Sequence, residues 1–311
     1  MTPTFKFYYL IVAILLISST TGFILKKRVS TARAQSIVDN LITRTNAWWG
    51  MIAILAIAFI VGRISTIVLF AFMSFFALRE FITLTPTRPG DHYALSLGFF
   101  FFIPLQYYLI WLNWYSLFAI MIPVYAFLFL PSISVLAQDT ENFLERASKI
   151  QWGLMIAVYC ISHAPALLML DIPGYAGQNA LLLFYLMLIA QISDVFQYVF
   201  GTLIGKTKVA PLVSPNKTVE GLVGGGLCAM LVGAAMWWIT PFTPLQSAGM
   251  AFAIVTMGFL GGLVMSAIKR SMGAKDWGTM IKGHGGMLDR LDSICFAAPI
   301  FFHLTRYFFT P

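Results

Sequence analysis

The stretch QSAGMAFAIVTMGFLGGLVMSA, residues 246–267, decides the class of fold, because it contains no charged side chain. A helix of about 20 apolar residues is long enough to cross the hydrocarbon core of a bilayer. The whole chain has the same character: of its 311 residues, 59% are hydrophobic and 10% are charged. Soluble domains carry about 25% charged residues. The sequence therefore predicts an all-α, polytopic helical integral membrane protein and excludes an ordinary soluble, disordered or coiled-coil chain.

Similar apolar runs recur along the chain and predict about ten transmembrane helices. The runs are long and unbroken, whereas the strands of an outer-membrane barrel alternate apolar and polar residues. We divide the chain into an N-terminal transmembrane region, 1–150, and a C-terminal transmembrane catalytic region, 151–311. The expected spans are 5–25, 47–62, 64–79, 94–112, 114–131, 152–170, 179–199, 220–239, 246–267 and 291–309.

The distribution of Lys and Arg predicts the orientation. Lys26, Lys27 and Arg28 directly follow the first span, and such charges hold that end of a helix in the cytoplasm. Alternation then places 17 of the 20 basic residues on the cytoplasmic side, including the loops 200–219 and 268–290. The net charge of +8 thus follows from topology and indicates no nucleic-acid partner. Short loops and the lack of a targeting sequence favour a bacterial inner membrane, with the active site facing the cytoplasm. The segments expected inside are 26–46, 80–93, 132–151, 200–219 and 268–290.

The concentration of Lys and Arg on the cytoplasmic side does not explain the aspartates at the start of the last span. Asp289 and Asp292 are three residues apart, which places both on one face of a helix that begins there. Carboxylates at the edge of the hydrocarbon are costly unless they bind a cation. Mg²⁺ is commonly bound by one or two carboxylates together with substrate phosphates. Nearby, Gly283, Gly285 and Gly286 leave backbone N–H groups open to close approach by an anion. The segment predicts a metal–polyphosphate site.

A second polar segment, 194–220, precedes the first, which spans 266–292, and the two segments together hold 13 of the 32 charged residues. Asp194 lies near the inner end of the seventh span, where an ionisable residue is a candidate for function. Ser214, Lys217 and Thr218 offer a hydroxyl, an ammonium and a second hydroxyl to a phosphate, and Glu220 falls in the first turn of the next span. A turn that leads into a helix start would explain the same residues.

Segment 266–292 resembles the signature of the phosphatidate cytidylyltransferase (CDP-diacylglycerol synthase) family. The segment Ser-Pro-Asn-Lys-Thr-Val-Glu-Gly, 214–221, is also similar to that family, and the two motifs together cover the C-terminal third of the chain. Lys282, Gln197 and Val219 stand where the family usually has Pro, Ala and Trp, which leaves open which lipid phosphate is the acceptor. The matching residues are Ser266, Lys269-Arg270, Lys275-Asp276, His284-Gly285-Gly286 and Asp289-Arg290-Leu291-Asp292.

The resemblance implies transfer of CMP from CTP to phosphatidate, which yields CDP-diacylglycerol and pyrophosphate. It implies Mg²⁺, with a second cation left open, and a homodimer. His284 either contacts phosphate or shapes the glycine-rich turn. The expected catalytic residues are Lys275, Asp276, Asp289 and Asp292. The expected metal ligands are Asp276, Asp289 and Asp292, with Asp194 and Glu220 as further candidates. The expected phosphate-binding residues are Ser214, Lys217, Thr218, Lys206, Lys208, Lys269, Arg270, His284 and Arg290. The alternatives are a CTP-dependent enzyme for another lipid phosphate and, from another class, a membrane transporter.

Overall fold

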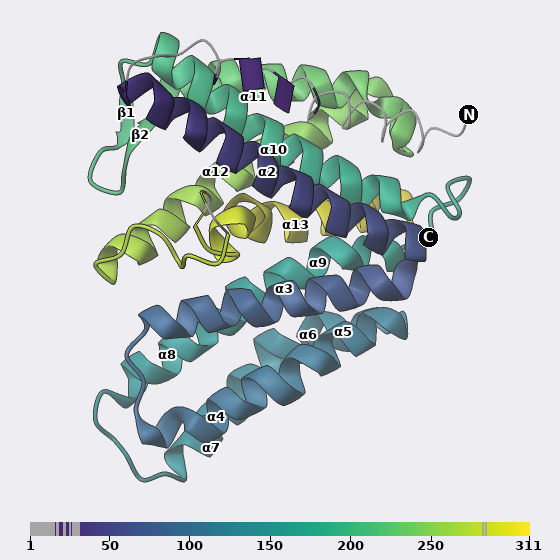
Figure 1. The fold of residues 1–311 in the computed structure, drawn as a ribbon. Coiled ribbons are helices and arrows are strands. Elements are labelled where there is room, and N and C mark those ends of the chain that lie inside the picture. Colours follow the sequence, from purple (N-terminus) through teal and green to yellow (C-terminus); the bar gives the residue numbers. More distant parts are fainter. Residues whose placement is uncertain are drawn as a thin grey trace.

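The computed structural model describes residues 32–281, 283 and 285–311, together with a few residues between 16 and 26. These residues form a helical bundle with one short hairpin, in which β1 (Lys208–Ala210) pairs antiparallel with β2 (Ser214–Thr218) (Figure 1). The helices are α2 (Ala32–Val61), α3 (Arg63–Leu84), α4 (His92–Leu97), α5 (Ile103–Trp111), α6 (Tyr115–Ile120), α7 (Phe127–Val135), α8 (Phe143–Leu154), α9 (Ile161–Ala166), α10 (Asn179–Leu203), α11 (Val219–Ala235), α12 (Pro244–Ser271) and α13 (Leu288–Phe309). The all-α prediction is confirmed.

Six described helical segments are long and apolar enough to cross a membrane. In three of them a π-helical turn joins two short α-helices, as at Gly98–Phe102 between α4 and α5. Two further apolar helices, Thr45–Val61 and Val219–Ala235, are shorter. The expected count of ten is not confirmed: the span 5–25 lies mostly outside the described residues, and α13 opens with a charged first turn. The six segments are Arg63–Leu84, Pro89–Trp111, Tyr115–Val135, Phe143–Met169, Asn179–Leu203 and Pro244–Ser271.

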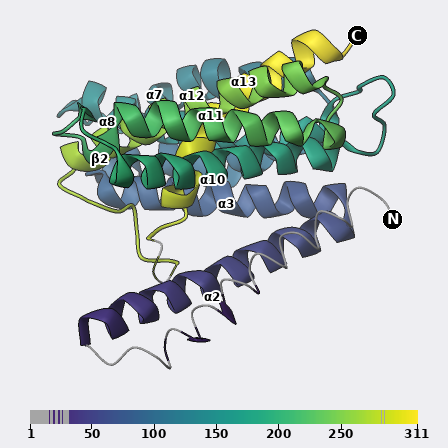
Figure 2. The same ribbon diagram turned by 90° about the horizontal axis from the view of Figure 1, so that it is seen from above.

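The segments that the sequence predicts to be cytoplasmic gather at one end of the bundle. In Figure 1 this is the left end, where the start of α2, the hairpin and the loop between α12 and α13 lie. The connections from α3 to α4 and from α7 to α8 lie at the same end. Seen from above, α2 is set off from the other helices, and its packing partner is α3 (Figure 2). The polar chemistry of the chain is therefore concentrated at one end of the helices.

Glycines bring α10 and α11 together beside the hairpin. A Cβ added to Gly225 would lie 2.4 Å from the backbone nitrogen of Gln197, and one added to Gly221 would lie 2.7 Å from the Gln197 carbonyl oxygen. Any larger side chain at either position would force the two backbones apart. The start of α11 is fixed by Thr218, whose hydroxyl accepts a hydrogen bond from the Gly221 N–H at 3.1 Å. The hairpin leads directly into α11, so the close approach of α10 and α11 also holds the hairpin against α10.

A buried ion-pair network joins two of the segments expected on the cytoplasmic side, 80–93 and 132–151. The Arg146 guanidinium lies 3.3 Å from Asp91 and 2.8 Å from Asp139, and it is almost fully buried. Arg88 adds a contact of 2.9 Å to Asp139. Burial alone would raise the pKa of the Asp139 carboxyl, but hydrogen bonds from Arg88, from the Glu141 backbone and from Arg146 lower it below its ordinary value. The network fixes the loop before α8 against the loop before α4.

Candidate functional site

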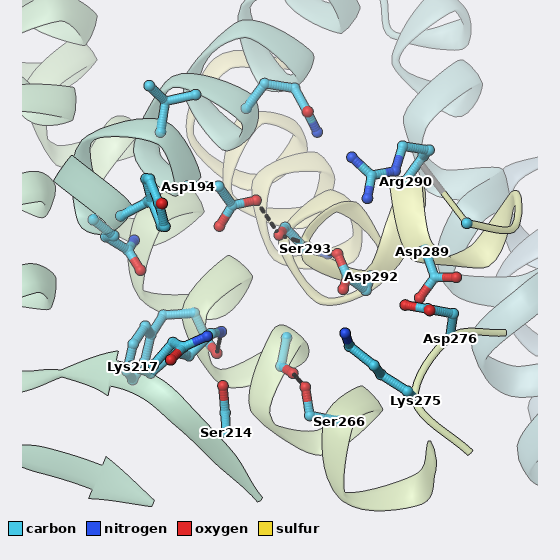
Figure 3. A pocket seen from close by; sticks show the side chains of 18 of the residues that line it. Asp194, Ser214, Lys217, Ser266, Lys275, Asp276, Asp289, Arg290, Asp292 and Ser293 are labelled. Atoms are coloured by element: carbon cyan, nitrogen blue, oxygen red, sulfur yellow. Dashed lines mark hydrogen bonds between the residues drawn. The ribbon is translucent and has the colours of Figure 1, made fainter. Parts of the chain in front are cut away.

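A large cavity opens where α10, the hairpin, α12 and the start of α13 meet (Figure 3). Its volume is about 990 Å³, and the loop between α12 and α13 forms part of its wall. Charged and hydroxyl side chains from both polar segments of the sequence meet here, although they are far apart along the chain. The sequence-predicted site residues that line it are Asp194, Ser214, Lys217, Thr218, Lys275, Asp276, Asp289, Arg290 and Asp292.

One serine joins two carboxylates at the centre of the cavity. The Ser293 hydroxyl donates to Asp194 at 2.6 Å and lies 3.4 Å from an oxygen of Asp292, which also accepts the Ser293 backbone N–H at 2.8 Å. Asp194 comes from α10 and Asp292 from α13, and both side chains line the cavity (Figure 3). Two carboxylates from different helices are thus brought to one point, where each keeps an oxygen with no hydrogen bond within the described part of the chain.

Lys217 supplies a cation opposite these carboxylates. Its ammonium donates to the carbonyl oxygen of Phe259 at 3.2 Å and lies 4.6 Å from the centre of the Phe259 ring. Burial lowers the pKa of Lys217, and the nearby charges of Asp194 and Asp292 oppose that effect. Gly262 makes room for the side chain, because a Cβ there would lie 2.5 Å from the Lys217 nitrogen.

Three further charged residues line the cavity from the last polar segment. The Arg290 Nε is buried and has no hydrogen-bond partner among the described residues. Its guanidinium points into the cavity toward Asp292 (Figure 3). Lys275 and Asp276 are exposed at the mouth. Arginine suits bidentate recognition of phosphate, so an arginine with a free donor beside lysines is suited to bind a polyphosphate.

Asp289 makes contacts that differ from those of Asp292. One of its oxygens pairs with Lys269 at 2.6 Å, and both side chains are at most 10% exposed. The other oxygen accepts the backbone N–H groups of Trp277 at 2.8 Å and Gly286 at 2.9 Å. Both oxygens of Asp289 are therefore engaged by the protein, and the carboxylate joins α12, α13 and the two ends of the loop between them.

Four other described residues of the expected metal- and phosphate-binding sets do not line the cavity. Glu220 accepts the backbone N–H groups of Lys206 and Thr207, each at 3.1 Å, and so holds the turn before the hairpin. Lys206 and Lys208 are exposed. Arg270 donates to the carbonyl oxygen of Ala274 at 2.9 Å at the end of α12. His284 and Lys282 lie outside the described residues.

One carboxylate that contacts this region was not predicted from the sequence. Glu80, near the end of α3, accepts the backbone N–H groups of Met287 at 2.8 Å and Leu288 at 2.9 Å. The signal for it was present, since a single carboxylate directly follows the apolar run 64–79 and an ionisable residue at the end of a span is a candidate for function. Of the two departures from the family pattern that are described, Gln197 lines the cavity and Val219 is exposed.

The carboxylates do not form a complete metal cage. Within residues 32–281, 283 and 285–311, no three His, Cys, Asp or Glu side chains are grouped so that they could hold a metal ion. The pair Asp194 and Asp292 comes nearest to such a group of ligands. A divalent cation bound by this pair would therefore need further oxygen ligands from substrate phosphates or from water.

Comparison with known proteins agrees with this chemistry. The chain is 40% identical over 265 residues, 85% of its length, to the uncharacterized protein YnbB of Escherichia coli, of which it covers 87%. It is 42% identical over 118 residues to a phosphatidate cytidylyltransferase of Staphylococcus aureus, and 36% identical over 157 residues to that of Staphylococcus haemolyticus. These two matches span 37% and 49% of this chain, and 45% and 60% of the relatives. The sequence model of the cytidylyltransferase family matches residues 42–308, and the chain belongs to that family.

Proposed function

We propose that this protein transfers CMP from CTP to phosphatidate and releases CDP-diacylglycerol and pyrophosphate. The observation that carries the proposal is the cavity in which the carboxylates Asp194 and Asp292 face the cations Lys217 and Arg290. The partial likeness to phosphatidate cytidylyltransferases supports the choice of lipid. CTP as the nucleotide substrate follows from the family.

The reaction needs charge stabilisation more than proton transfer. A phosphate oxygen of the lipid attacks the α-phosphorus of CTP, and the bond to pyrophosphate breaks in line with it. The nucleophile is already an anion, so the main barrier is to bring two anions together and to stabilise the charge of the leaving group. Lys217 and Arg290 are half-buried in the cavity wall and suited to that role, and the exposed Lys275 can meet the triphosphate as it enters.

The pair Asp194 and Asp292 fits Mg²⁺. Magnesium takes hard oxygen ligands and usually binds one or two carboxylates together with substrate phosphates. Each of the two carboxylates has an oxygen with no hydrogen bond in the described part of the chain, and Asp276 also lines the cavity. The ion would neutralise phosphate charge. Asp289 and Glu220 fit less well, because both carboxylates already accept donors of the protein.

The lipid would enter from the side of the bundle. Val195 and Tyr198 line the cavity, yet their side chains are 57% and 68% exposed on the outer surface of α10. Acyl chains could therefore stay in the hydrocarbon while the phosphate reaches the carboxylates. We place this end of the bundle at the cytoplasmic face of a bacterial inner membrane, because that is where CTP is made and where the basic segments gather.

The experiment is a transfer assay with detergent-purified protein. Labelled CTP and Mg²⁺ are incubated with phosphatidate, or with a polyprenyl phosphate in a parallel reaction, and the lipid phase is counted. We expect label in CDP-diacylglycerol and at least about 100-fold less after Asp292→Asn. Asp171→Asn, at an exposed aspartate before α10, is the matched control and should remain active. Label on the polyprenyl lipid alone would change the acceptor, and label on neither lipid would refute the transferase.

A further inference from the structure

We infer that Glu80 is a positioning residue for the site, because it holds the loop between α12 and α13 in place from the N-terminal half of the chain. This loop, residues 272–287, carries Lys275 and Asp276 to the cavity. Glu80 lies on α3, more than 200 residues before the backbone groups that it binds. The inference concerns how the cavity is kept in shape, and it rests on the proposed function for its activity measurement.

The contacts of Glu80 are directional and use both carboxylate oxygens. Oε1 accepts the Met287 N–H at 2.8 Å, and Oε2 accepts the Leu288 N–H at 2.9 Å. These N–H groups belong to the start of α13, where the first donors of a helix have no partner within the helix. A carboxylate there also interacts favourably with the helix dipole. Glu80 therefore fixes the point at which the loop ends and the helix that carries Arg290 and Asp292 begins.

Two glycines of the loop leave space for this carboxylate. A Cβ added to Gly286 would lie 2.4 Å from Oε2 of Glu80, and one added to Gly278 would lie 2.9 Å from Oε1. At both positions the three nearest atoms to the added Cβ all belong to Glu80. Neither glycine has a positive φ angle, so the backbone itself would accept alanine. The lack of a side chain at these positions is explained by the Glu80 carboxylate.

The neighbour of Glu80 holds the other end of the same loop. The ring of Phe81 stacks on Trp277 with a centroid distance of 5.4 Å, and Trp277 is 2% exposed. The backbone N–H of Trp277 in turn donates to Asp289 at 2.8 Å. Two adjacent residues of α3 thus contact the loop at Trp277 and at its end, and the cavity-lining residues Lys275 and Asp276 lie just before Trp277.

The first test compares single variants in the transfer assay. Glu80→Ala should lower kcat about 100-fold and raise the KM for CTP, because displacement of a site by about 1 Å costs a factor of this size. Glu80→Gln keeps one acceptor oxygen and should lose roughly tenfold. Glu145→Gln, on the exposed surface of α8, is the matched control and should stay within twofold of the wild type. Loss of folded protein alone would lower kcat and leave the KM for CTP unchanged, and that result would contradict a positioning role.

The second test is a cycle that combines Glu80→Ala with Gly286→Ala. The clash that Gly286→Ala creates is with Glu80, so the second substitution should cost little once the carboxylate is gone. We expect the double variant to be within about threefold of Glu80→Ala. Activity equal to the product of the two single losses would overturn the inference, as would a Glu80→Ala variant with wild-type kinetics.

Hydrogen exchange separates this inference from the proposed function. If the wild type transfers CMP to neither lipid, the proposed function fails, but the contact can still be measured. The backbone amides of Met287 and Leu288 should exchange at least about tenfold faster in Glu80→Ala than in the wild type, since hydrogen bonds to a charged acceptor are among the stronger ones. Unchanged exchange at these two amides would refute the contact, whatever the enzyme assay gives.

Discussion

Replacement of Asp289 by asparagine should destabilise the protein in a way that replacement of a neighbouring aspartate does not. Asp289 and Lys269 form a pair at 2.6 Å, with side chains 5% and 10% exposed. Loss of one partner from a buried pair costs about 3–5 kcal/mol, because the remaining charge is left without compensation. The side-chain amide oxygen of the variant could still accept the N–H groups of Trp277 and Gly286, so we expect the lower end of this range. A value near 3 kcal/mol is a large part of a typical stability of about 5–15 kcal/mol.

The assay is thermal unfolding of the detergent-purified protein, followed by tryptophan fluorescence. The unfolding entropy of about 2.1 cal/mol/K per residue makes 1 kcal/mol equivalent to roughly 1.5 °C in Tm for a chain of 311 residues. We therefore expect a decrease of roughly 5 °C for Asp289→Asn. Asp276→Asn is the control, because Asp276 lies in the loop that Asp289 holds and its side chain is exposed. Its Tm should change by less than about 2 °C, in line with the small effects of surface substitutions, whereas its transfer activity should fall.

A double variant isolates the pair itself. Lys269→Met alone leaves a buried carboxylate with only backbone donors, and Asp289→Asn alone leaves a buried ammonium. The combined Lys269→Met and Asp289→Asn variant leaves neither charge, so its destabilisation should be smaller than the sum of the two by about 1–3 kcal/mol. Strictly additive destabilisation in the double variant, or an Asp289→Asn variant with the Tm of the wild type, would refute the role of Asp289 in holding the loop.

Two further substitutions test other parts of the structure. Gly262→Ala should lower transfer activity roughly tenfold by displacing the Lys217 ammonium, and Gly249→Ala on the same helix, where nothing lies within 4 Å of the added Cβ, should have no effect. Asp139→Asn should lower Tm at pH 7, and the difference from the wild type should shrink as pH falls below about 4, because a carboxylate whose pKa is lowered in the folded state contributes stability only while it is ionised. A Tm difference that does not change with pH would exclude the ion pair with Arg88 as its source.

The class of fold and most helices could be predicted from the sequence because both depend on local properties. Uncharged runs of membrane-spanning length leave few alternatives to a helix. The start of α12 depends on residues that are neighbours in the sequence. Thr243 caps the helix, Pro244 occupies its first turn, and the side-chain oxygen of Gln246 accepts the backbone N–H of Thr243. The number of membrane spans is a weaker prediction, since α13 mixes an apolar body with Asp289, and the sequence pattern does not define how such a helix meets the bilayer.

The individual roles of the carboxylates could not be predicted, because they depend on tertiary neighbours. Asp289 and Asp292 share one motif and lie one turn apart, yet Asp289 pairs with Lys269 and Asp292 contacts Ser293. Glu220 belongs to a motif that looks like a ligand set, and its carboxylate holds a turn. The type and spacing of residues identified the region of the cavity, and packing decided which oxygens stay available for a ligand.

The glycines of the last polar segment show why this distinction matters for function. A run of glycines indicates that some anion approaches the backbone closely, but it does not say whether the anion is a substrate or the protein itself. At Gly278 and Gly286 the anion is Glu80. Gly283 and Gly285 line the cavity and have φ angles of 75° and 81°, so a side chain at either position would be strained. A Cβ added to Gly285 would also lie 2.6 Å from a carboxylate oxygen of Asp289. At Gly278, Gly285 and Gly286 the close neighbour is thus a carboxylate of the protein itself, and the residue types alone do not distinguish such a glycine from one that faces a substrate.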